Sequence, residues 1–457
     1  MFQTVNTATP ISLAVKYNLP VPRYTSYPAV PDWNSSIDAS GWSDHFREAF
    51  SKQHPRNGLS LYLHLPFCES LCTYCGCNKK ITTNHDVEDP YIKALLEEWK
   101  IYRDLMSEVP VIRECHLGGG TPTFFSPAHL EHLLHAIFNL AVVPKHHEFS
   151  FEGHPNNTTS DHLAVLKAAG FRRVSYGIQD LDPVVQRTIN RIQPFENVVR
   201  VTEEARRQGY RSINFDLIYG LPRQTEKSLK KTLKTALSLR PDRIAFYSYA
   251  HVPWTSRAQR LFDEHDLPDP ETKLRLYETG KQIFLKHGYQ EIGMDHFALP
   301  GDDLSLARQE GRLHRNFMGY TPLPSALLLG LGVSSISDTG FGYAQNAKSL
   351  LEYYAAVATG KPAVVKGYYS QQEEQTIRKH IQQIICHGHT SLDRQALSAI
   401  HPNWLERLSP LEADGLVNSE GNNITVTAAG FSFLRNICAA IDPRFEPNNK
   451  PVYSKAV

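Results

Sequence analysis

The sequence has almost no excess of charge of either sign: 48 lysines and arginines face 47 aspartates and glutamates, giving a formal net charge of +1. It therefore lacks the overall positive field that attracts nucleic acid or an anionic membrane surface. Long hydrophobic runs are also lacking. The longest, residues 326–333, is interrupted by glycines and falls well short of the roughly 18 residues of a membrane-spanning helix. We therefore expect no nucleic acid and no membrane among its partners.

The N-terminus has no early basic cluster, and its short apolar run at residues 11–15 is too brief for the core of a secretory signal. The sequence therefore predicts a cytoplasmic protein. Its 457 residues, 41% hydrophobic and 21% charged, are typical of an ordinary folded chain. This length allows about three domains, or one large α/β domain with additions.

Six short apolar runs alternate with segments of helical period from about residue 58 onward, a pattern typical of parallel β-strands joined by helices. The runs are residues 59–66, 113–120, 147–154, 172–179, 212–220 and 243–250. In residues 91–105, apolar side chains such as Ile92, Leu95 and Trp99 recur at steps of three and four, which makes one helical stripe. The predicted fold class is α/β, a partial six-unit barrel similar to a TIM barrel.

Each of these runs ends in glycine-rich or polar residues, such as GGGTP after the second run and EGHP after the third. In a barrel of parallel strands, the loops after the strands share one rim and build the active site. We therefore expect these loops to converge on one cavity.

The chain changes character beyond residue 367. Helical patterns at residues 372–387 and near residues 405–416, an alternating stretch with Asn422 and Asn423 at its turn, and a last helix through Phe433 resemble a winged-helix arrangement. Residues 371–442 hold five basic and eight acidic residues, so a DNA-binding face is not expected. We predict an N-terminal arm over the active site (1–50), a catalytic barrel with an extension (51–366) and a helical, winged-helix-like C-terminal domain (367–457).

Seven cysteines are present, and four of them crowd into ten residues. The spacing Cys68-x3-Cys72-x2-Cys75 puts three thiolates on one loop after the first strand, where they can hold three corners of a 4Fe-4S cluster and leave one iron open. We expect Cys77, only two residues beyond, not to bind the cluster. A structural zinc site with four cysteines is the alternative. The remaining cysteines are expected to be small buried side chains: Cys115, Cys386 and Cys438.

An open iron on a barrel rim suits a ligand that chelates through an amine and a carboxylate, as the methionine end of S-adenosylmethionine does. The motifs FCESLCTYCGCNK, RYTSYP, GGGTPT, SYGIQD, NFDLIYGLP, GMDHF, LHRN, GLGVSSIS and AQN resemble, over nearly the whole chain, the oxygen-independent coproporphyrinogen III oxidase family of radical S-adenosylmethionine enzymes. The resemblance implies an oxidoreductase of porphyrin and haem biosynthesis. In that reaction a 5′-deoxyadenosyl radical takes hydrogen from a propionate β-carbon, and loss of carbon dioxide and one electron leaves a vinyl group. Two propionates of coproporphyrinogen III react in this way, giving protoporphyrinogen IX.

The resemblance also implies the site residues and two bound S-adenosylmethionine molecules. The cluster ligands are Cys68, Cys72 and Cys75, and Cys77 and Glu152 join them in the catalytic set. Contacts to S-adenosylmethionine fall on Tyr62, Tyr74, Gly119, Gly120, Thr121, Glu152, Gln179, Arg191, Asp216, Ala250 and Ile336. Without the resemblance, tyrosines and apolar residues at such positions would be assigned to barrel packing, and a single carboxylate to a solvated rim.

Substrate recognition needs cationic or donor groups for four propionates. The candidates in the arm and in LHRN are Arg23, Tyr24, Tyr27, His314 and Arg315. The chain departs from some family members at Gly153-His154, Met318 and Ala326-Leu327. The implied partners are coproporphyrinogen III, an electron donor similar to flavodoxin or ferredoxin, and an electron acceptor, with the chain a monomer.

Three alternatives remain open on the sequence alone. A related radical enzyme acting on another tetrapyrrole would keep the radical chemistry and change the outcome. A haem chaperone would keep the barrel and cluster motif without oxidase activity, although the fourth cysteine and the RYTSYP arm favour the oxidase. A zinc-stabilised regulatory protein would use the winged-helix-like segment for DNA, which its negative charge disfavours.

Overall fold

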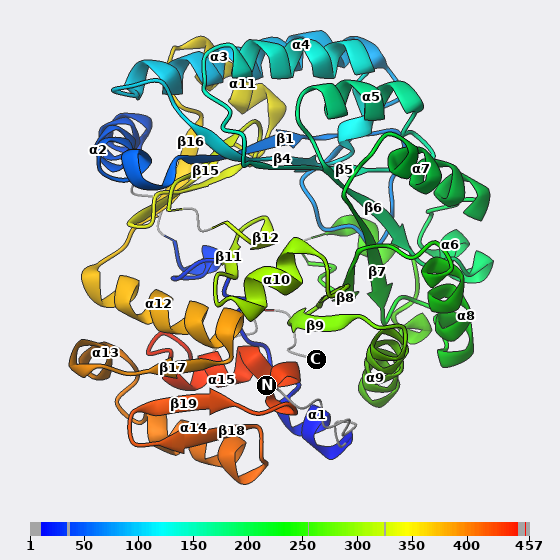
Figure 1. Cartoon of the computed structure of the whole chain (residues 1–457), viewed down its shortest axis with the longest axis vertical. Coiled ribbons are helices and arrows are strands. Elements are labelled where there is room, and N and C mark those ends of the chain that lie inside the picture. The colour runs from blue at the N-terminus through cyan, green and yellow to red at the C-terminus, as the bar shows by residue number, and fades with distance from the viewer. Residues whose placement is uncertain (1–10, 34–36, 255, 324–325, 447–452, 454–457) are drawn as a thin grey trace.

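The computed structural model describes residues 11–33, 37–254, 256–323, 326–446 and 453. Its centre is a twelve-stranded sheet with the strand order β16-β15-β14-β13-β1-β4-β5-β6-β7-β8-β10-β9. The sheet curves, with helices on its outer side, and the C-terminal helices lie across its open side (Figure 1). Among the described residues, no helix combines the length and the apolar composition needed to cross a lipid bilayer.

Six neighbouring strands of this sheet are parallel and confirm the six predicted runs. They are β1 (Leu59–Leu65), β4 (Ile112–Gly119), β5 (Glu148–Gly153), β6 (Arg173–Gln179), β7 (Ser212–Tyr219) and β8 (Arg243–Ser248). In β1 the side chains of Leu61, Leu63 and Leu65 are fully buried in the main hydrophobic core, whereas Tyr62 and His64 alternate with them. This alternation aims the polar side chains at the interior of the partial barrel.

Helices connect the parallel strands and cover their outer face. They are α3 (Glu88–Leu105), α4 (Pro127–Phe138), α5 (Ser160–Ala168), α6 (Pro183–Thr188), α7 (Phe195–Arg207), α8 (Glu226–Leu237) and α9 (Pro270–Lys286). The predicted stripe in α3 is buried at Ile92, Leu95 and Trp99. Ser126 begins α4 as its N-cap, with a proline directly after it, and its hydroxyl accepts from the His129 backbone N–H at 3.3 Å.

Shorter strands extend the sheet at both ends. On the β1 side they are β13 (Leu328–Leu331), β14 (Ile336–Asp338), β15 (Gly342–Asn346) and β16 (Val364–Tyr369), and on the β8 side β10 (His296–Ala298) and β9 (Gln290–Gly293). Except for the parallel β1–β13 pair, the added pairs are antiparallel. The connecting elements include α10 (Asp303–Gln309), α11 (Leu350–Ala358) and the hairpin of β11 (His314–Asn316) and β12 (Gly319–Thr321). The partial barrel predicted from the sequence is confirmed, with β9 and β16 as its free edges.

The N-terminal segment contains more regular structure than the predicted arm. After α1 (Ile11–Tyr17) and an extended stretch, α2 (Ala39–Asn57) is a helix of 19 residues that crosses the predicted boundary at residue 50. Trp42, Phe46 and Phe50 recur every fourth residue on its buried face and join the barrel core. This part of the segment therefore belongs to the packed body.

The C-terminal segment forms the predicted succession of helices and a hairpin, with additional short elements. They are α12 (Gln372–His387), β17 (His389–Ser391), α13 (Arg394–Ala399), α14 (Trp404–Ala413), β18 (Val417–Glu420), β19 (Asn423–Val426) and α15 (Leu434–Ile441). Its core also includes Tyr24 and Tyr27 of the arm and Tyr320 of β12. The segment therefore shares its core with the N-terminal arm and the end of the barrel.

Candidate functional site

The cysteine loop begins directly after β1. Two short parallel strands, β2 (Phe67–Cys68) and β3 (Lys80–Ile81), pair at its base and close it into a compact loop. The Thr82 backbone N–H donates to the Cys68 carbonyl at 2.9 Å, which extends this closure. The other three thiols of the motif lie on the loop between these strands.

The surroundings of the thiols differ from one another. The Cys68 sulfur lies 3.3 Å from the Thr121 hydroxyl, and burial raises the pKa of the Cys68 thiol to about 11. Nη1 of Arg191 lies 3.6 Å from the Cys72 sulfur. A hydrogen bond from Cys77 lowers the pKa of Cys75 to about 6, which favours its thiolate.

The loop and its surroundings fit an iron–sulfur cluster. A cubane cluster takes each thiolate on a different iron. Beside the loop, Nε of Arg191 and Oε1 of Gln179 are buried without a hydrogen-bond partner in the described structure, so the site presents polar atoms to a group larger than an ion. Cys68, Cys72 and Cys75 are the residues that would hold the cluster.

A cavity of about 580 Å³ lies inside the curve of the sheet, next to this loop. This volume is in the range of sites for small molecules and cofactors. Five of the predicted site residues line it: Tyr62, Cys77, Gly119, Glu152 and Ile336. The other predicted residues do not line it. Asp216 lies within β7 and Gln179 at the end of β6, and the rest lie in the segments that follow the strands: Cys68, Cys72, Cys75, Tyr74, Gly120, Thr121, Arg191 and Ala250.

The two glycines of GGGTP that the sequence singled out have separate structural reasons. Gly119 has φ +115, and a Cβ there would lie 2.8 Å from the ring of His64. A Cβ on Gly120 would lie 2.5 Å from the backbone of Pro66. The link from β1 to β2 therefore packs directly against this loop, and glycine is required for that approach.

Acidic and amide side chains line the inner face of β5, β6 and β7. Glu152 of β5 is part-exposed and lies 3.5 Å from Nε2 of His116. Asp216 accepts hydrogen bonds from Ser175 at 3.0 Å and from Asn214 at 2.7 Å, and burial raises its pKa to about 7. These side chains can accept from hydroxyl or ammonium groups of a ligand.

Gln179 and Arg191 come together at the end of β6. Gln179 has φ +66, a conformation that side chains other than glycine rarely adopt. Nη2 of Arg191 donates to the Gly177 carbonyl at 2.5 Å, and both side chains crowd Gly177 so that a Cβ there would lie within 3 Å of each. The fold therefore holds Arg191 between β6 and the cysteine loop.

The side chain of Gln259 links Tyr74 and Ala250, which are the other two predicted contacts to S-adenosylmethionine. Its side-chain amide donates to the Tyr74 carbonyl at 2.9 Å and to the Ala250 carbonyl at 3.2 Å. Tyr74 packs against a small apolar cluster that includes Val185 and Ile189. Both residues therefore lie where the loop after β8 meets the cysteine loop.

Sequence reasoning missed two histidines of the cavity. His64 lies between the Tyr62 hydroxyl, at 3.1 Å from Nδ1, and the Asn78 carbonyl, at 2.9 Å from Nε2. His116 lies next to Ser150, at 2.8 Å from Nδ1. The alternation of polar with fully buried leucine residues in β1 was the signal that could have identified His64, because it places His64 and Tyr62 on one face.

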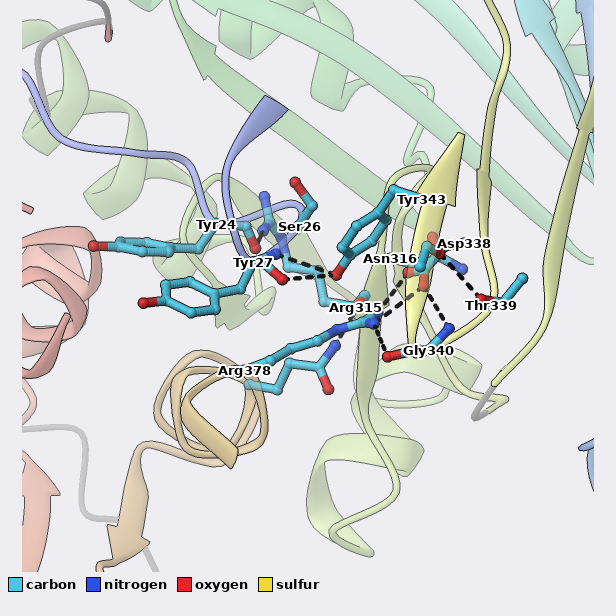
Figure 2. A network of polar contacts seen from close by, with 12 residues as sticks. Tyr24, Ser26, Tyr27, Arg315, Asn316, Asp338, Thr339, Gly340, Tyr343 and Arg378 are labelled. Atoms are coloured by element: carbon cyan, nitrogen blue, oxygen red, sulfur yellow. Dashed lines mark hydrogen bonds and ion pairs between the residues drawn. The ribbon is translucent and has the colours of Figure 1, made fainter. Parts of the chain in front are cut away.

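Three arginines also line the cavity and are together called its cationic wall: Arg23 of the arm, Arg315 of β11 and Arg435 of α15. They lie near Asp295, whose pKa is raised because burial outweighs the lowering effect of these three arginines and of Lys273. Nη1 of Arg315 donates to the carbonyls of Arg23 and Tyr24 at 3.0 and 3.1 Å. Arg315 and Tyr24 are labelled in Figure 2. Because three cations face one carboxylate, this wall is suited to binding anionic groups.

The other three substrate candidates do not line this cavity. The hydroxyls of Tyr24 and Tyr27 donate to Asp442 at 3.0 and 2.8 Å and tie the arm to the end of α15. His314 lies in a separate shallow pocket beside Arg378. The two tyrosines therefore have a structural role in holding the arm, and contact of Tyr24, Tyr27 and His314 with the substrate stays a prediction.

The departures from the family pattern lie in different places. Met318 lines the cavity, and Ala326 lies in the shallow pocket with His314. Leu327 is fully buried in the barrel core. Burial and the nearby Arg191 lower the pKa of His154 to about 2, so this ring is neutral. Of the positions compared, Met318 is the one that can touch a ligand in the cavity.

The comparisons with known proteins agree with this geometry. A family model described as the Radical SAM superfamily matches residues 62–236, from β1 through most of α8, and defines the class to which the fold and the cysteine loop belong. Oxygen-independent coproporphyrinogen III oxidase from Pseudomonas aeruginosa is 36% identical over 455 residues, covering 97% of each chain. The Escherichia coli protein of that name is 39% identical over 443 residues, covering 94% of each chain.

A solved structure extends the likeness to the whole fold. The structure of coproporphyrinogen III oxidase from Escherichia coli, described as a Radical SAM enzyme, superposes with a TM-score of 0.88 at 36% identity and covers 96% of this chain and 100% of that chain. The chain belongs to the oxygen-independent coproporphyrinogen III oxidase family. It is a radical S-adenosylmethionine oxidoreductase, with a 4Fe-4S cluster and S-adenosylmethionine, two molecules of it, as cofactors.

Proposed function

We propose that this chain converts two propionate side chains of coproporphyrinogen III to vinyl groups, giving protoporphyrinogen IX without oxygen. The single observation that carries the proposal is the shared cavity, which Cys77 of the cysteine loop and Glu152 line together with Arg23, Arg315 and Arg435. Arginine is the side chain best suited to binding carboxylates. A porphyrinogen with four propionates can therefore be held by the arginines while another part of it faces the cysteine loop.

In this proposal some residues of the chain hold the cofactors and others hold the substrate. When bound, the cluster and S-adenosylmethionine supply a 5′-deoxyadenosyl radical that removes hydrogen from a propionate β-carbon. The side chains of Glu152 and Asp216 would accept hydrogen bonds from S-adenosylmethionine, and Arg191, whose Nη1 lies 3.6 Å from the Cys72 sulfur, would also contact it. Further contacts to S-adenosylmethionine are assigned to Tyr62, Tyr74, Gly119, Gly120, Thr121, Gln179, Ala250 and Ile336.

The arginines of the cationic wall bind the carboxylates of the substrate and do not act on the carbon that reacts. Arg23 and Arg435 come from opposite ends of the chain, and their placement around Asp295 leaves an excess of positive charge inside the protein. The propionate that reacts loses carbon dioxide and one electron, so the reaction also needs an acceptor protein or molecule. The proposal also takes the chain to be a cytoplasmic monomer that consists of an N-terminal arm, a barrel and a C-terminal domain.

An anaerobic assay tests this function. Reconstituted and reduced protein is mixed with S-adenosylmethionine and coproporphyrinogen III, and both products are followed by mass spectrometry. The proposal predicts protoporphyrinogen IX and about two molecules of 5′-deoxyadenosine for each porphyrinogen converted. Deoxyadenosine without decarboxylated tetrapyrrole would move the substrate to another tetrapyrrole, and the lack of both products would favour a haem chaperone.

A further inference from the structure

The turn between β9 and β10 carries the motif GMDHF, residues 293–297, in which none of the predicted site residues falls. Its backbone is held from two sides. The Phe246 backbone N–H donates to the Asp295 carbonyl at 2.7 Å, and Gly293 packs so closely on Tyr320 that a Cβ there would overlap the phenol hydroxyl. The turn places the Asp295 side chain in the lining of the cavity.

The Asp295 carboxylate has no hydrogen-bond or ion-pair partner among the described residues. The buried Asp302 carboxylate, by comparison, accepts from the Ser212 hydroxyl at 2.8 Å and from Nε of Arg243 at 2.6 Å. A ligand that fills the cavity displaces water from Asp295, and an acceptor that loses its water without gaining a donor is costly. The occupant of this cavity is therefore expected to bring donors for this carboxylate.

The cations nearby favour the charged form of Asp295 without occupying its oxygens. Burial raises the pKa of Asp295, and the arginines of the cationic wall together with Lys273 oppose that rise. Arg315 donates to two carbonyls of the arm, and Nε of Arg435 donates to the Pro22 carbonyl at 3.2 Å. The cavity therefore offers several cations and, among them, one acidic acceptor.

A porphyrinogen carries two kinds of polar group in separate places. Its propionates lie at the rim of the macrocycle and suit the arginines. Its four pyrrole N–H groups lie at the centre, and all of them are donors. An ionised carboxylate has two oxygens with about four acceptor sites, so one aspartate can accept from several of these N–H groups.

We propose that Asp295 binds the pyrrole N–H groups of the porphyrinogen and thereby selects the reduced tetrapyrrole. The inference rests on the proposed function, because it concerns the substrate of that cavity. The oxidised porphyrin has the same propionates but only two N–H groups in a flat aromatic ring, and its copper complex has none. A site that hydrogen-bonds a donor of its substrate rejects an analogue that lacks the donor, because the protein group is then left unpaired.

This contact also places the macrocycle beside the cofactor residues. Tyr247 of β8 lines the cavity, and its pKa is raised by burial and then by Asp216, Asp295 and Glu152. One phenol thus lies near Asp295 and near the two carboxylates assigned to S-adenosylmethionine. A porphyrinogen held at its centre by Asp295 therefore has part of its rim near Glu152 and Asp216.

The test is a binding measurement without turnover. Full-length protein with its reconstituted, oxidised cluster is titrated anaerobically in a calorimeter with coproporphyrinogen III, coproporphyrin III and copper coproporphyrin III. We expect Asp295→Asn to raise Kd for the porphyrinogen about tenfold to a hundredfold, because hydrogen bonds to a charged acceptor are lost. Kd for the two oxidised ligands should stay unchanged or fall, because a negative charge near their propionates is removed.

The ratio of the Kd values separates this role from others. Differences in shape between the ligands are the same in both proteins and cancel when the ratios are compared. Asp104→Asn removes the same charge from an exposed position near the end of α3 and should leave all three Kd values unchanged. Iron content and thermal unfolding, measured on each variant, report whether the barrel is intact.

Three results would overturn the role of Asp295. An equal rise of all three Kd values would assign it to the structure of the cavity, and an equal fall would make it only a counter-charge to the arginines. An unchanged preference for the porphyrinogen would show that the N–H groups bind elsewhere.

The proposed function can fail separately. If the unchanged protein bound none of the three tetrapyrroles, the proposed substrate would be wrong, and the role of Asp295 with it. If the unchanged protein formed protoporphyrinogen IX while Asp295→Asn kept its preference, the proposed function would stand and only this contact would be contradicted.

Discussion

Cys77 differs from the other cysteines of its loop in where it lies. It lines the cavity, whereas Cys68, Cys72 and Cys75 do not, and it forms a hydrogen bond with Cys75. This position supports the expectation from sequence spacing that Cys77 is not a cluster ligand. It places the fourth thiol in the cavity that Glu152 and the three arginines also line.

We predict that Cys77→Ser takes up iron and sulfide at the wild-type level after anaerobic reconstitution but loses most of its activity. Cys72→Ser is the matched control and should lose most of its iron, because three protein ligands are needed to hold the cluster. Iron and labile sulfide per chain, measured with the activity, decide the outcome. Equal iron loss in the two variants would assign Cys77 to the cluster.

Glu98 is a second residue with a role that the sequence did not reveal. Fully buried in α3, it accepts hydrogen bonds from the Gly332 backbone N–H at 2.7 Å, the Tyr353 hydroxyl at 2.7 Å and the Asn346 amide at 2.6 Å. It thereby fixes the turn after β13, which leads into Ile336 at the cavity. Burial raises the pKa of Glu98 to about 7 in spite of these donors.

This raised pKa makes a pH-dependent contribution to stability. Between about pH 4.5 and pH 7 the native state holds a proton on Glu98 that the unfolded state has lost, so the free energy of unfolding falls as pH rises. Glu98→Gln removes the contribution. We expect the difference in unfolding free energy between wild type and this variant to fall by roughly 2 to 3 kcal/mol from pH 5 to pH 8.

Denaturant titrations at several pH values measure this difference. Glu352→Gln changes an exposed glutamate of α11 and serves as the control, for which the difference from wild type should stay constant. A constant difference for Glu98→Gln as well would contradict the account of Glu98.

At the scale of elements, a polar network holds the arm against the sheet and the C-terminal segment (Figure 2). The Tyr343 hydroxyl of β15 donates to the Tyr27 carbonyl at 3.2 Å and lies 3.3 Å from the Tyr27 backbone N–H. Arg378 of α12 pairs with Asp338 of β14, with Nη1 at 3.1 Å from Oδ1, and stacks over Tyr343 at 5.3 Å. Together with the bonds from Tyr24 and Tyr27 to Asp442, these contacts position Arg23 at the cavity.

We predict that Tyr24→Phe with Tyr27→Phe loosens the arm. The change leaves the buried Asp442 carboxylate without two of its donors, which costs about 1–3 kcal/mol for each unmet polar group. Amide hydrogen exchange should become faster in residues 21–28 and 434–441 and stay unchanged in the barrel strands. Tyr210→Phe removes another phenol hydrogen bond, to the Leu163 carbonyl, and should leave the arm unaffected. Unchanged exchange in the arm of the double variant would contradict this role.

The elements themselves differ in how well the sequence predicted them. The parallel strands and α12 were predicted within two residues, because apolar runs and helical periodicity follow directly from burial on a sheet or in a core. The helix α2 was not predicted. Trp42, Phe46 and Phe50 have the spacing of one helix face, but the polar residues between them weaken the apolar periodicity. The short α13 and β17 carry too few residues to show a period, and neighbouring elements specify them.

At the scale of the whole molecule, the cavity is made by parts of the chain that are far apart in sequence. Arg23 and Arg435 are separated by more than 400 residues and lie on one wall with Arg315. Local patterns predicted the cysteine loop and the barrel rim. They could not predict that Asp295 and Arg435 lie at the cavity. The packing of the C-terminal segment on the arm brings them there, and the local spacing of residues does not determine that packing.

We predict that Arg23→Gln with Arg435→Gln weakens substrate binding. Loss of charge-assisted bonds to carboxylates should cost about 1–3 kcal/mol, so KM for coproporphyrinogen III should rise about tenfold to a hundredfold, with a smaller change in kcat. The iron content should stay at the wild-type level, which shows that the barrel is folded. A fall in kcat with KM unchanged would place these arginines at the reacting carbon instead.

The most direct measurement uses coproporphyrinogen III with deuterium on the β-carbons of its propionates. The central claim is that the shared cavity brings a propionate β-carbon of the substrate to the radical generated beside the cysteine loop. Mass spectrometry of the 5′-deoxyadenosine formed in anaerobic turnover should then show one added deuterium in each molecule. Deoxyadenosine without deuterium, formed together with the vinyl product, would contradict the account, because hydrogen would then have been taken from another position.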